Sequence, residues 1–153
     1  MVVLHSVLAL RRLRRLEAPA ELGEDLCGVM FSDFDHNLRE IGVGDLSVGK
    51  KVRKLAEAFY GRGKALDAAL ASAEPRAEVA KVLTRNVFVG TETGTALGLA
   101  DYVIAADDAL GLASLGDIVE GQLPFPRPSR VMDSRTANSA RSRDGVAQGA
   151  LDG

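Results

Sequence analysis

Apolar residues recur three or four positions apart along most of this chain, which is the spacing that lines one face of an α-helix. The clearest run before the paired glycines 42 and 44 is Leu26, Cys27, Met30, Phe31, Phe34, Leu38 and Ile41. After those glycines the same spacing continues with Val48, Val52, Leu55 and Phe59. No stretch alternates apolar and polar residues between turn signals, as a strand would. The pattern predicts an all-α fold, a single domain of about five to seven helices over residues 1–128.

Pro75 suits the first turn of a helix, because its fixed φ is helical and its missing N–H is not needed there. The expected buried faces are Val79, Val82, Leu83 and Val87 in that helix, and Leu99, Val103, Ala106 and Leu110 in a later one. From Pro124 onward the periodicity ends, and small, polar and charged residues dominate. Such a segment cannot bury enough apolar surface to offset its ordering entropy. We therefore predict a disordered tail over residues 129–153.

Charges follow one another in blocks, although the net charge of the 153 residues is only −2. Basic blocks at 11–15 and 50–64 are separated by acidic residues, and every charge between 91 and 121 is acidic. Such blocks favour helices packed side by side with complementary faces, and the alternative is a surface for a charged partner. The slightly acidic balance argues against a protein dedicated to specific DNA or RNA binding. A ribosome- or RNA-associated module using the basic helix is the weakest alternative.

The stretch GDLSVGKK, residues 44–51, imitates a phosphate-binding loop, with Gly44, Gly49 and Lys50 in register. Such a loop follows a buried strand, but an amphipathic helix precedes this one. Lys51 stands where Ser or Thr would hold magnesium, and Asp45 would repel a phosphate. We therefore interpret the segment as the turn of a helical hairpin. A phosphate-handling enzyme that uses this loop is kept as an alternative function.

In that turn, glycine supplies the positive φ that ends the first helix. Asp45 or Ser47 is expected to cap the next helix by accepting its free amide protons. Gly42, Gly44 and Asp45 are thus assigned a structural role in the turn. If Gly44 has a positive φ, replacing it by Val should destabilise the fold.

Asp33 and Asp35 resemble the D-x-D motif of phosphatases that use an aspartate nucleophile, and with Asn37 they form part of a calcium-loop pattern. On a helix the two carboxylates point about 200° apart, so they cannot converge on one phosphate or metal ion. The favoured interpretation is a solvated helix face with Asp35 and Arg39 as an i,i+4 ion pair. Phosphate chemistry at Asp33 and Asp35 is the other form of the enzyme alternative.

No other residues suggest catalysis or a metal site. His5 and His36 are far apart in sequence and lack the spacing of zinc ligands. Cys27 lies on the apolar stripe, where a cysteine is usually a small core residue. The start of the chain has arginines after its apolar residues, which is unlike a secretory signal. It is closer to an Arg-rich amphipathic transit segment, but an ordinary helix is favoured.

Residues 31–62 resemble the signature of the ubiquinol-cytochrome c chaperone family. The family pattern D-x-x-L-R-E-x-G-V-G-D-L-x-V is met by Asp35, Leu38, Arg39, Glu40, Gly42, Val43, Gly44, Asp45, Leu46 and Val48, and F-Y-G-R by residues 59–62. LHSVLALRRL, LTRNVF and GQLPFP resemble further parts of the family, so the likeness covers roughly residues 2–126. Related chains usually carry a few dozen more residues before LHSVLALRRL. We therefore expect the N-terminal part of the family domain to be missing.

The resemblance implies a non-enzymatic chaperone that binds newly made cytochrome b during assembly of respiratory complex III. The implied partners are this client, a small partner protein and the ribosome, and no cofactor or metal is expected. A bacterial member would work in the cytoplasm or at the inner membrane, and a eukaryotic one on the matrix side of mitochondria.

The resemblance and the charge pattern together suggest which residues contact the client or a partner. They are Asp35, Leu38, Arg39, Glu40, Lys50, Lys51, Lys54, Phe59, Tyr60 and Arg62. An accessible apolar patch on the hairpin, flanked by its lysines, would suit a membrane-protein client. The alternative is that the later helices cover these apolar stripes entirely.

Overall fold

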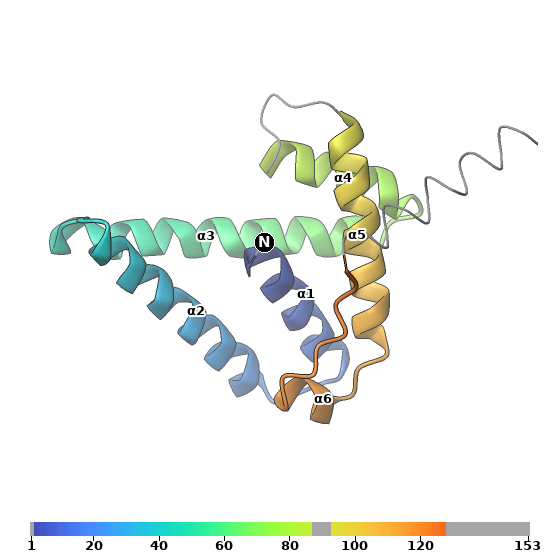
Figure 1. Cartoon of the computed structure of the whole chain (residues 1–153), viewed down its shortest axis with the longest axis horizontal. Helices are drawn as coiled ribbons and strands as arrows, with labels where there is room; N and C mark the ends of the chain where they lie inside the picture. Colours follow the sequence, from blue (N-terminus) through green and yellow to red (C-terminus); the bar gives the residue numbers. More distant parts are fainter. Residues whose placement is uncertain (1, 87–92, 128–153) are drawn as a thin grey trace, which may run out of the picture.

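The computed structural model describes residues 2–86 and 93–127, and these form six α-helices and no strand (Figure 1). The helices are α1 (Val2–Arg15), α2 (Ala20–Glu40), α3 (Asp45–Leu70), α4 (Pro75–Asn86), α5 (Thr93–Gly111) and α6 (Leu115–Val119). The predicted all-α fold is confirmed, and the helix expected to begin at Pro75 does so. Val87 and the tail predicted over 129–153 lie outside the described residues.

Helix α3 is the longest element, and α1, α2 and α4 contact it at different points along its length (Figure 1). Helix α2 leads into it through the hairpin turn, α1 packs against α2, α3 and α5, and α4 lies across the end of α3 that is remote from the turn. Helix α5 packs against α4 and α1. The fully buried side chains come from several of these helices: Leu8, Val48, Val79, Val103 and Leu110. At the turn, α2 and α3 have no other described helix beside them, and they project from the body.

The apolar stripes of α2 and α3 pack mainly against each other in this hairpin. Val48 is fully buried, and the rings of Phe31 and Phe59 meet edge to face with centroids 5.6 Å apart. The later helices do not cover the stripes entirely, because Leu55 of the α3 stripe keeps 41% of its surface exposed. The placing of Ile41 on the buried stripe was wrong. Helix α2 ends at Glu40, and Ile41 lies in the turn with 77% of its surface exposed.

The hairpin turn contains one positive φ, at Gly42 (+87°), whose amide donates to the Arg39 carbonyl (2.9 Å). Gly44 has φ −64° and forms the N-cap of α3, so a positive φ at Gly44 is excluded. The predicted caps were also wrong, since neither Asp45 nor Ser47 accepts a capping hydrogen bond. Asp45 lies inside the first turn of α3 and pairs with Arg39, while the Ser47 hydroxyl donates to the Gly44 carbonyl.

The basic block of α1 faces carboxylates of α3 and α5, as the complementary charge blocks predicted. Arg11 donates to Asp67 of α3 (2.8 Å) and to Asp107 of α5 (3.0 Å). Burial lowers the pKa of Arg11, but hydrogen bonds and charges of the two aspartates outweigh this and raise it above its ordinary value. Arg14 adds a bond to Asp67 (2.6 Å), and Arg15 lies 3.5 Å from Asp107. This cluster links α1 to both α3 and α5.

Candidate functional site

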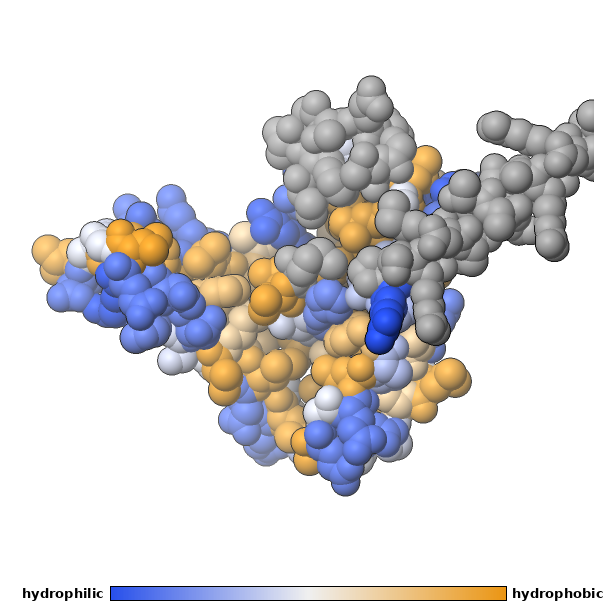
Figure 2. Space-filling model, in the orientation of Figure 1, coloured by the Kyte–Doolittle hydropathy of each residue, from blue (hydrophilic) through white to orange (hydrophobic). Residues whose placement is uncertain are grey.

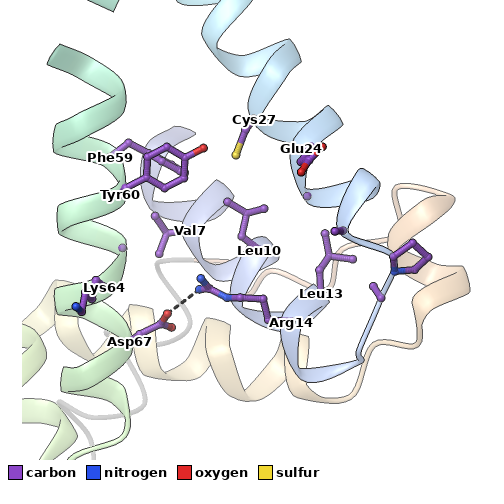
Figure 3. Close-up of a pocket in the computed structure, with 15 residues that line it drawn as sticks. Val7, Leu10, Leu13, Arg14, Glu24, Cys27, Phe59, Tyr60, Lys64 and Asp67 are labelled. Carbon is purple, nitrogen blue, oxygen red and sulfur yellow. Dashed lines mark hydrogen bonds and ion pairs between the residues drawn. The ribbon is translucent and has the colours of Figure 1, made fainter. Parts of the chain in front are cut away.

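An open cavity of about 490 Å³ lies between α1, α2 and α3 (Figure 3). Its wall is largely apolar, and Figure 3 shows side chains of all three helices around it. The apolar wall is formed by Val7, Leu10 and Leu13 of α1, Cys27 of α2 and Phe59 of α3, with Ala18, Pro19 and Ala20 at one end. We call this cavity the three-helix groove. Two small residues widen it, since Gly23 and Gly63 bring no side chain to the wall.

Polar side chains surround the apolar wall of the three-helix groove. Arg14 and Asp67 form an ion pair of 2.6 Å across its edge, marked in Figure 3, and Glu24 and Lys64 add one charge of each sign. The Tyr60 hydroxyl faces the Cys27 thiol. A hydrogen bond with Cys27, followed by partial burial and the nearby charges, raises the pKa of Tyr60 above its ordinary value. The tyrosine therefore stays a neutral hydrogen-bonding group at the mouth of an apolar channel.

The structure divides the ten residues predicted for client or partner binding among three places. Phe59 and Tyr60 line the three-helix groove. Arg62 lies on α3 and donates to the Asn86 side chain of α4 (3.1 Å), which gives it a structural contact. The remaining seven belong to the part of the hairpin near its turn: Asp35, Leu38, Arg39, Glu40, Lys50, Lys51 and Lys54. Whether any of the ten binds a partner stays a prediction.

Near the turn, the hairpin carries an ion-pair network on α2 and unpaired lysines on α3. Arg39 bridges Asp35 (2.6 Å), as predicted for an i,i+4 pair, and Asp45. These contacts raise the pKa of Arg39, with the Asp35 hydrogen bond as the largest cause. Among the described residues, Lys50, Lys51 and Lys54 are exposed and form no ion pair. The side chains of these three lysines are therefore accessible to solvent.

The residues considered for a phosphate-handling enzyme do not come together in a reactive site. Asp33 is exposed on α2, whereas Asp35 is engaged by Arg39. Lys50 and Lys51 lie in the second turn of α3, since the imitation phosphate loop is helical from Asp45 onward. The amides from Ser47 onward therefore donate to carbonyls of the same segment instead of converging on a phosphate. Among the described residues, no three His, Cys, Asp or Glu side chains lie together where they could hold a metal ion.

Sequence reasoning missed most of the three-helix groove. Leu10, Leu13, Arg14, Glu24 and Lys64 were not singled out, and Cys27 was assigned to the core. Cys27 is indeed buried, but it also faces the cavity. The apolar spacing of α1 signalled a helix, yet a cavity depends on the angle at which three helices diverge. That angle is set by tertiary packing and leaves no local signal in the sequence.

No helix among the described residues is both long enough and apolar enough to cross a membrane. A comparison with curated protein sequences finds no match. The chain is similar to the crystal structure of the Cbp3 homolog from Brucella abortus, with 37% identity and a TM-score of 0.72. That similarity covers 83% of this chain and 71% of the other. The family model described as ubiquinol-cytochrome C chaperone matches residues 1–125. This match spans every helix described above, and the chain therefore belongs to the ubiquinol-cytochrome c chaperone family, which serves the assembly of ubiquinol–cytochrome c reductase.

Proposed function

We propose that this protein acts without catalysis to hold newly made cytochrome b, and that the three-helix groove receives an apolar segment of that client. The observation that carries the proposal is the open apolar wall of the groove, framed by charged side chains. Exposed apolar surface costs free energy in a monomer and commonly marks a place where a partner binds. Cytochrome b is a membrane protein, so its apolar helices need cover before they are assembled.

The size of the groove fits several side chains of a client helix. Pockets of roughly 300–1,000 Å³ enclose a drug-sized ligand, so about 490 Å³ is room for several apolar side chains. An amphipathic helix laid in such a groove inserts the residues that repeat at i, i+3, i+4 and i+7. Phe59 gives an aromatic wall for these anchors, while Tyr60 at the mouth offers a ring and a hydroxyl. Aromatic side chains of this kind carry much of the energy of protein interfaces.

The framing charges suit the polar ends of a client segment. Glu24 and Asp67 can face basic residues, which are frequent where membrane helices enter the cytoplasm. Lys64 and Arg14 can face acidic residues or a helix C-terminus. A small partner protein and the ribosome are further proposed partners on the strength of the family resemblance. We place the activity in the cytoplasm beside the inner membrane of a bacterium, or on the matrix side in a mitochondrion.

The experiment is capture of cytochrome b by a tagged copy of the protein from membranes solubilised in mild detergent. Leu10→Asn and Tyr60→Ser change the groove wall and its mouth. Each removes apolar contact area from the client, and the loss of one well-buried side chain is worth about 1.5–3 kcal/mol. Recovery of cytochrome b should therefore fall about tenfold or more.

A matched control is Leu55→Asn, because Leu55 is partly exposed on α3 but does not line the groove. Circular dichroism establishes that each variant remains folded. The proposal is wrong if the folded groove variants and the control recover the same amount of cytochrome b as the unaltered protein. Equal loss in all three variants would also count against the groove, since a change outside it would then act as strongly as the changes within it.

A further inference from the structure

The turn of the α2–α3 hairpin exposes apolar side chains at the end of a projecting arm. Leu46, in the first turn of α3, is fully exposed (103%), and Ile41 in the turn is 77% exposed. Figure 2 shows apolar surface at this end of the molecule, beside hydrophilic surface. Neither residue lines the three-helix groove. We call Ile41, Val43 and Leu46 the apolar tip.

Basic side chains follow the apolar tip directly along α3. At 100° per residue, Leu46 and Lys50 point about 40° apart, and Lys54 follows a further 40° around the helix. The three residues therefore share the outward side of α3, opposite the buried Val48. Lys51 lies nearer the side of the buried stripe and is also exposed. The tip thus combines exposed apolar groups with cations that lack described partners.

Most acidic residues near the tip contact a basic side chain of the hairpin rather than Lys50, Lys51 or Lys54. Asp35 and Asp45 share Arg39, and Arg53 pairs with Glu57 (3.2 Å). Glu40 lies 3.2 Å from the His36 ring. Lys50, Lys51 and Lys54 are exposed, have no ion-pair partner among the described residues, and are complementary to an anionic surface.

We propose that the apolar tip docks on a bilayer surface that contains anionic lipids, with Lys50, Lys51 and Lys54 on the lipid headgroups. The spacing of these residues along α3 matches the thickness of the lipid headgroup region. Helical rise places Lys50 about 6 Å and Lys54 about 12 Å from Leu46 along α3. The headgroup region adds roughly 5–8 Å on each side of the hydrocarbon core. When Ile41 and Leu46 lie at the boundary of the acyl chains, Lys50 lies among the headgroups. The flexible side chain of Lys54 reaches back to the same headgroups.

This role is independent of client binding, because it uses the other end of the hairpin and needs no cytochrome b. The sequence put forward the same lysines as client contacts. A membrane surface fits better, since the lysines accompany exposed tip residues and lie away from the groove. A two-part contact of this kind, apolar side chains with nearby cations, is how peripheral proteins bind anionic membranes.

The chain contains no tryptophan, so one introduced residue reports on its own surroundings. Leu46→Trp puts the fluorophore at the tip, and Leu112→Trp puts it at a similarly exposed position (89%) between α5 and α6. Vesicles of phosphatidylcholine with about one third phosphatidylglycerol are the probe. Emission from Leu46→Trp should shift to shorter wavelength on adding them, and Leu112→Trp should not respond. Pure phosphatidylcholine should give a much smaller shift.

The lysines are tested by flotation of the full-length protein with the same vesicles. Reversal of Lys50, Lys51 and Lys54 to Glu should weaken association with the vesicles about tenfold or more. Raised salt should weaken the association of the unaltered protein with the same vesicles. The Lys50→Glu variant should bind the vesicles less well than the Arg85→Glu variant, which carries a matched change at an exposed residue of α4.

Three outcomes would overturn the proposal. One is the absence of binding to anionic vesicles. Another is vesicle binding that leaves Leu46→Trp unshifted or shifts Leu112→Trp equally, because contact would then be made elsewhere. The third is a folded triple variant that binds vesicles normally but loses cytochrome b in detergent. That result would assign the lysines to the client.

Discussion

Replacing Arg11 by Met tests whether the ion cluster around α1 stabilises the arrangement of three helices. Met keeps much of the volume and apolar stem of the arginine, but it removes the bonds to Asp67 and Asp107. The Arg11 side chain is only 11% exposed, so water does not replace these bonds freely. Each aspartate keeps one other, more exposed arginine as a partner: Asp67 still pairs with Arg14, and Asp107 lies 3.5 Å from Arg15.

The expected loss follows from these contacts. A hydrogen bond to a charged group contributes about 1.5–3 kcal/mol, and removing one partner of a fully buried pair costs about 3–5 kcal/mol. Here two bonds are lost, but both carboxylates keep another cation and some contact with water. We therefore expect a loss of about 2–3 kcal/mol in the free energy of unfolding. For a domain of this size that lowers the melting temperature by roughly 6–15 °C.

The assay is urea unfolding followed by circular dichroism at neutral pH, with Arg15→Met as the control. Arg15 is 53% exposed and makes one long ion pair, so its loss should cost less than about 1 kcal/mol. Equal stability of the two variants would show that the cluster does not hold the helices together. In that case, apolar packing alone would set the position of α1 and hence the width of the three-helix groove.

Four further substitutions test the turn, the imitation phosphate loop and the last helix. Gly42→Ala should lower the free energy of unfolding in urea by about 1 kcal/mol or more, because the φ of Gly42 is positive. Gly44→Ala should lower it by about 0.5 kcal/mol, because it alters the N-cap of α3. Lys50→Ala should leave the melting temperature unchanged, and neither it nor the unaltered protein should bind ATP in calorimetry. Hydrogen bonds from the Ser114 hydroxyl and amide lower the pKa of Asp117. The Asp117 carboxylate of the folded protein therefore stabilises α6 above about pH 4, and this effect is lost as the pH falls through the lowered pKa. Amide exchange of α6 should show this pH dependence, and Asp117→Asn should abolish it.

The helices were predictable because their signals are local. Apolar spacing is repeated within a few residues, and Pro75 marks a helix start by its own geometry. Helix α6 could also have been found, since Ser114 and Asp117 form a reciprocal capping box that is visible in the sequence. The turn was predicted as a turn, but two nearby glycines did not reveal which one has the positive φ. That choice depends on where α2 ends, and helix ends are weakly specified by local sequence.

The candidate site was less predictable because it depends on relations between helices. Phe59 and Tyr60 were put forward from the family pattern, but nothing near them in sequence indicates that Leu10 and Leu13 face them across a cavity. The charge blocks predicted helices packed with complementary faces, and the ion pair between Arg11 of α1 and Asp107 of the acidic helix α5 bears this out. The lysines of α3 belong to the same kind of block and find no such partner. Charge order alone therefore does not separate a structural face from an interaction surface.

Both proposed surfaces include residues of α3, and this restricts what the protein can hold while it is docked. Leu46 and Tyr60 are 14 residues apart on α3, and at 1.5 Å per residue their separation along the axis is about 21 Å. If the apolar tip meets the bilayer with α3 upright, the near end of the three-helix groove stands about this far from the acyl chains. A tilted α3 brings the groove closer. A client segment in the groove would then lie outside the hydrocarbon core and still be covalently continuous with helices already inserted in it. The arrangement therefore suits a segment that has not yet entered the bilayer, rather than one already packed in lipid.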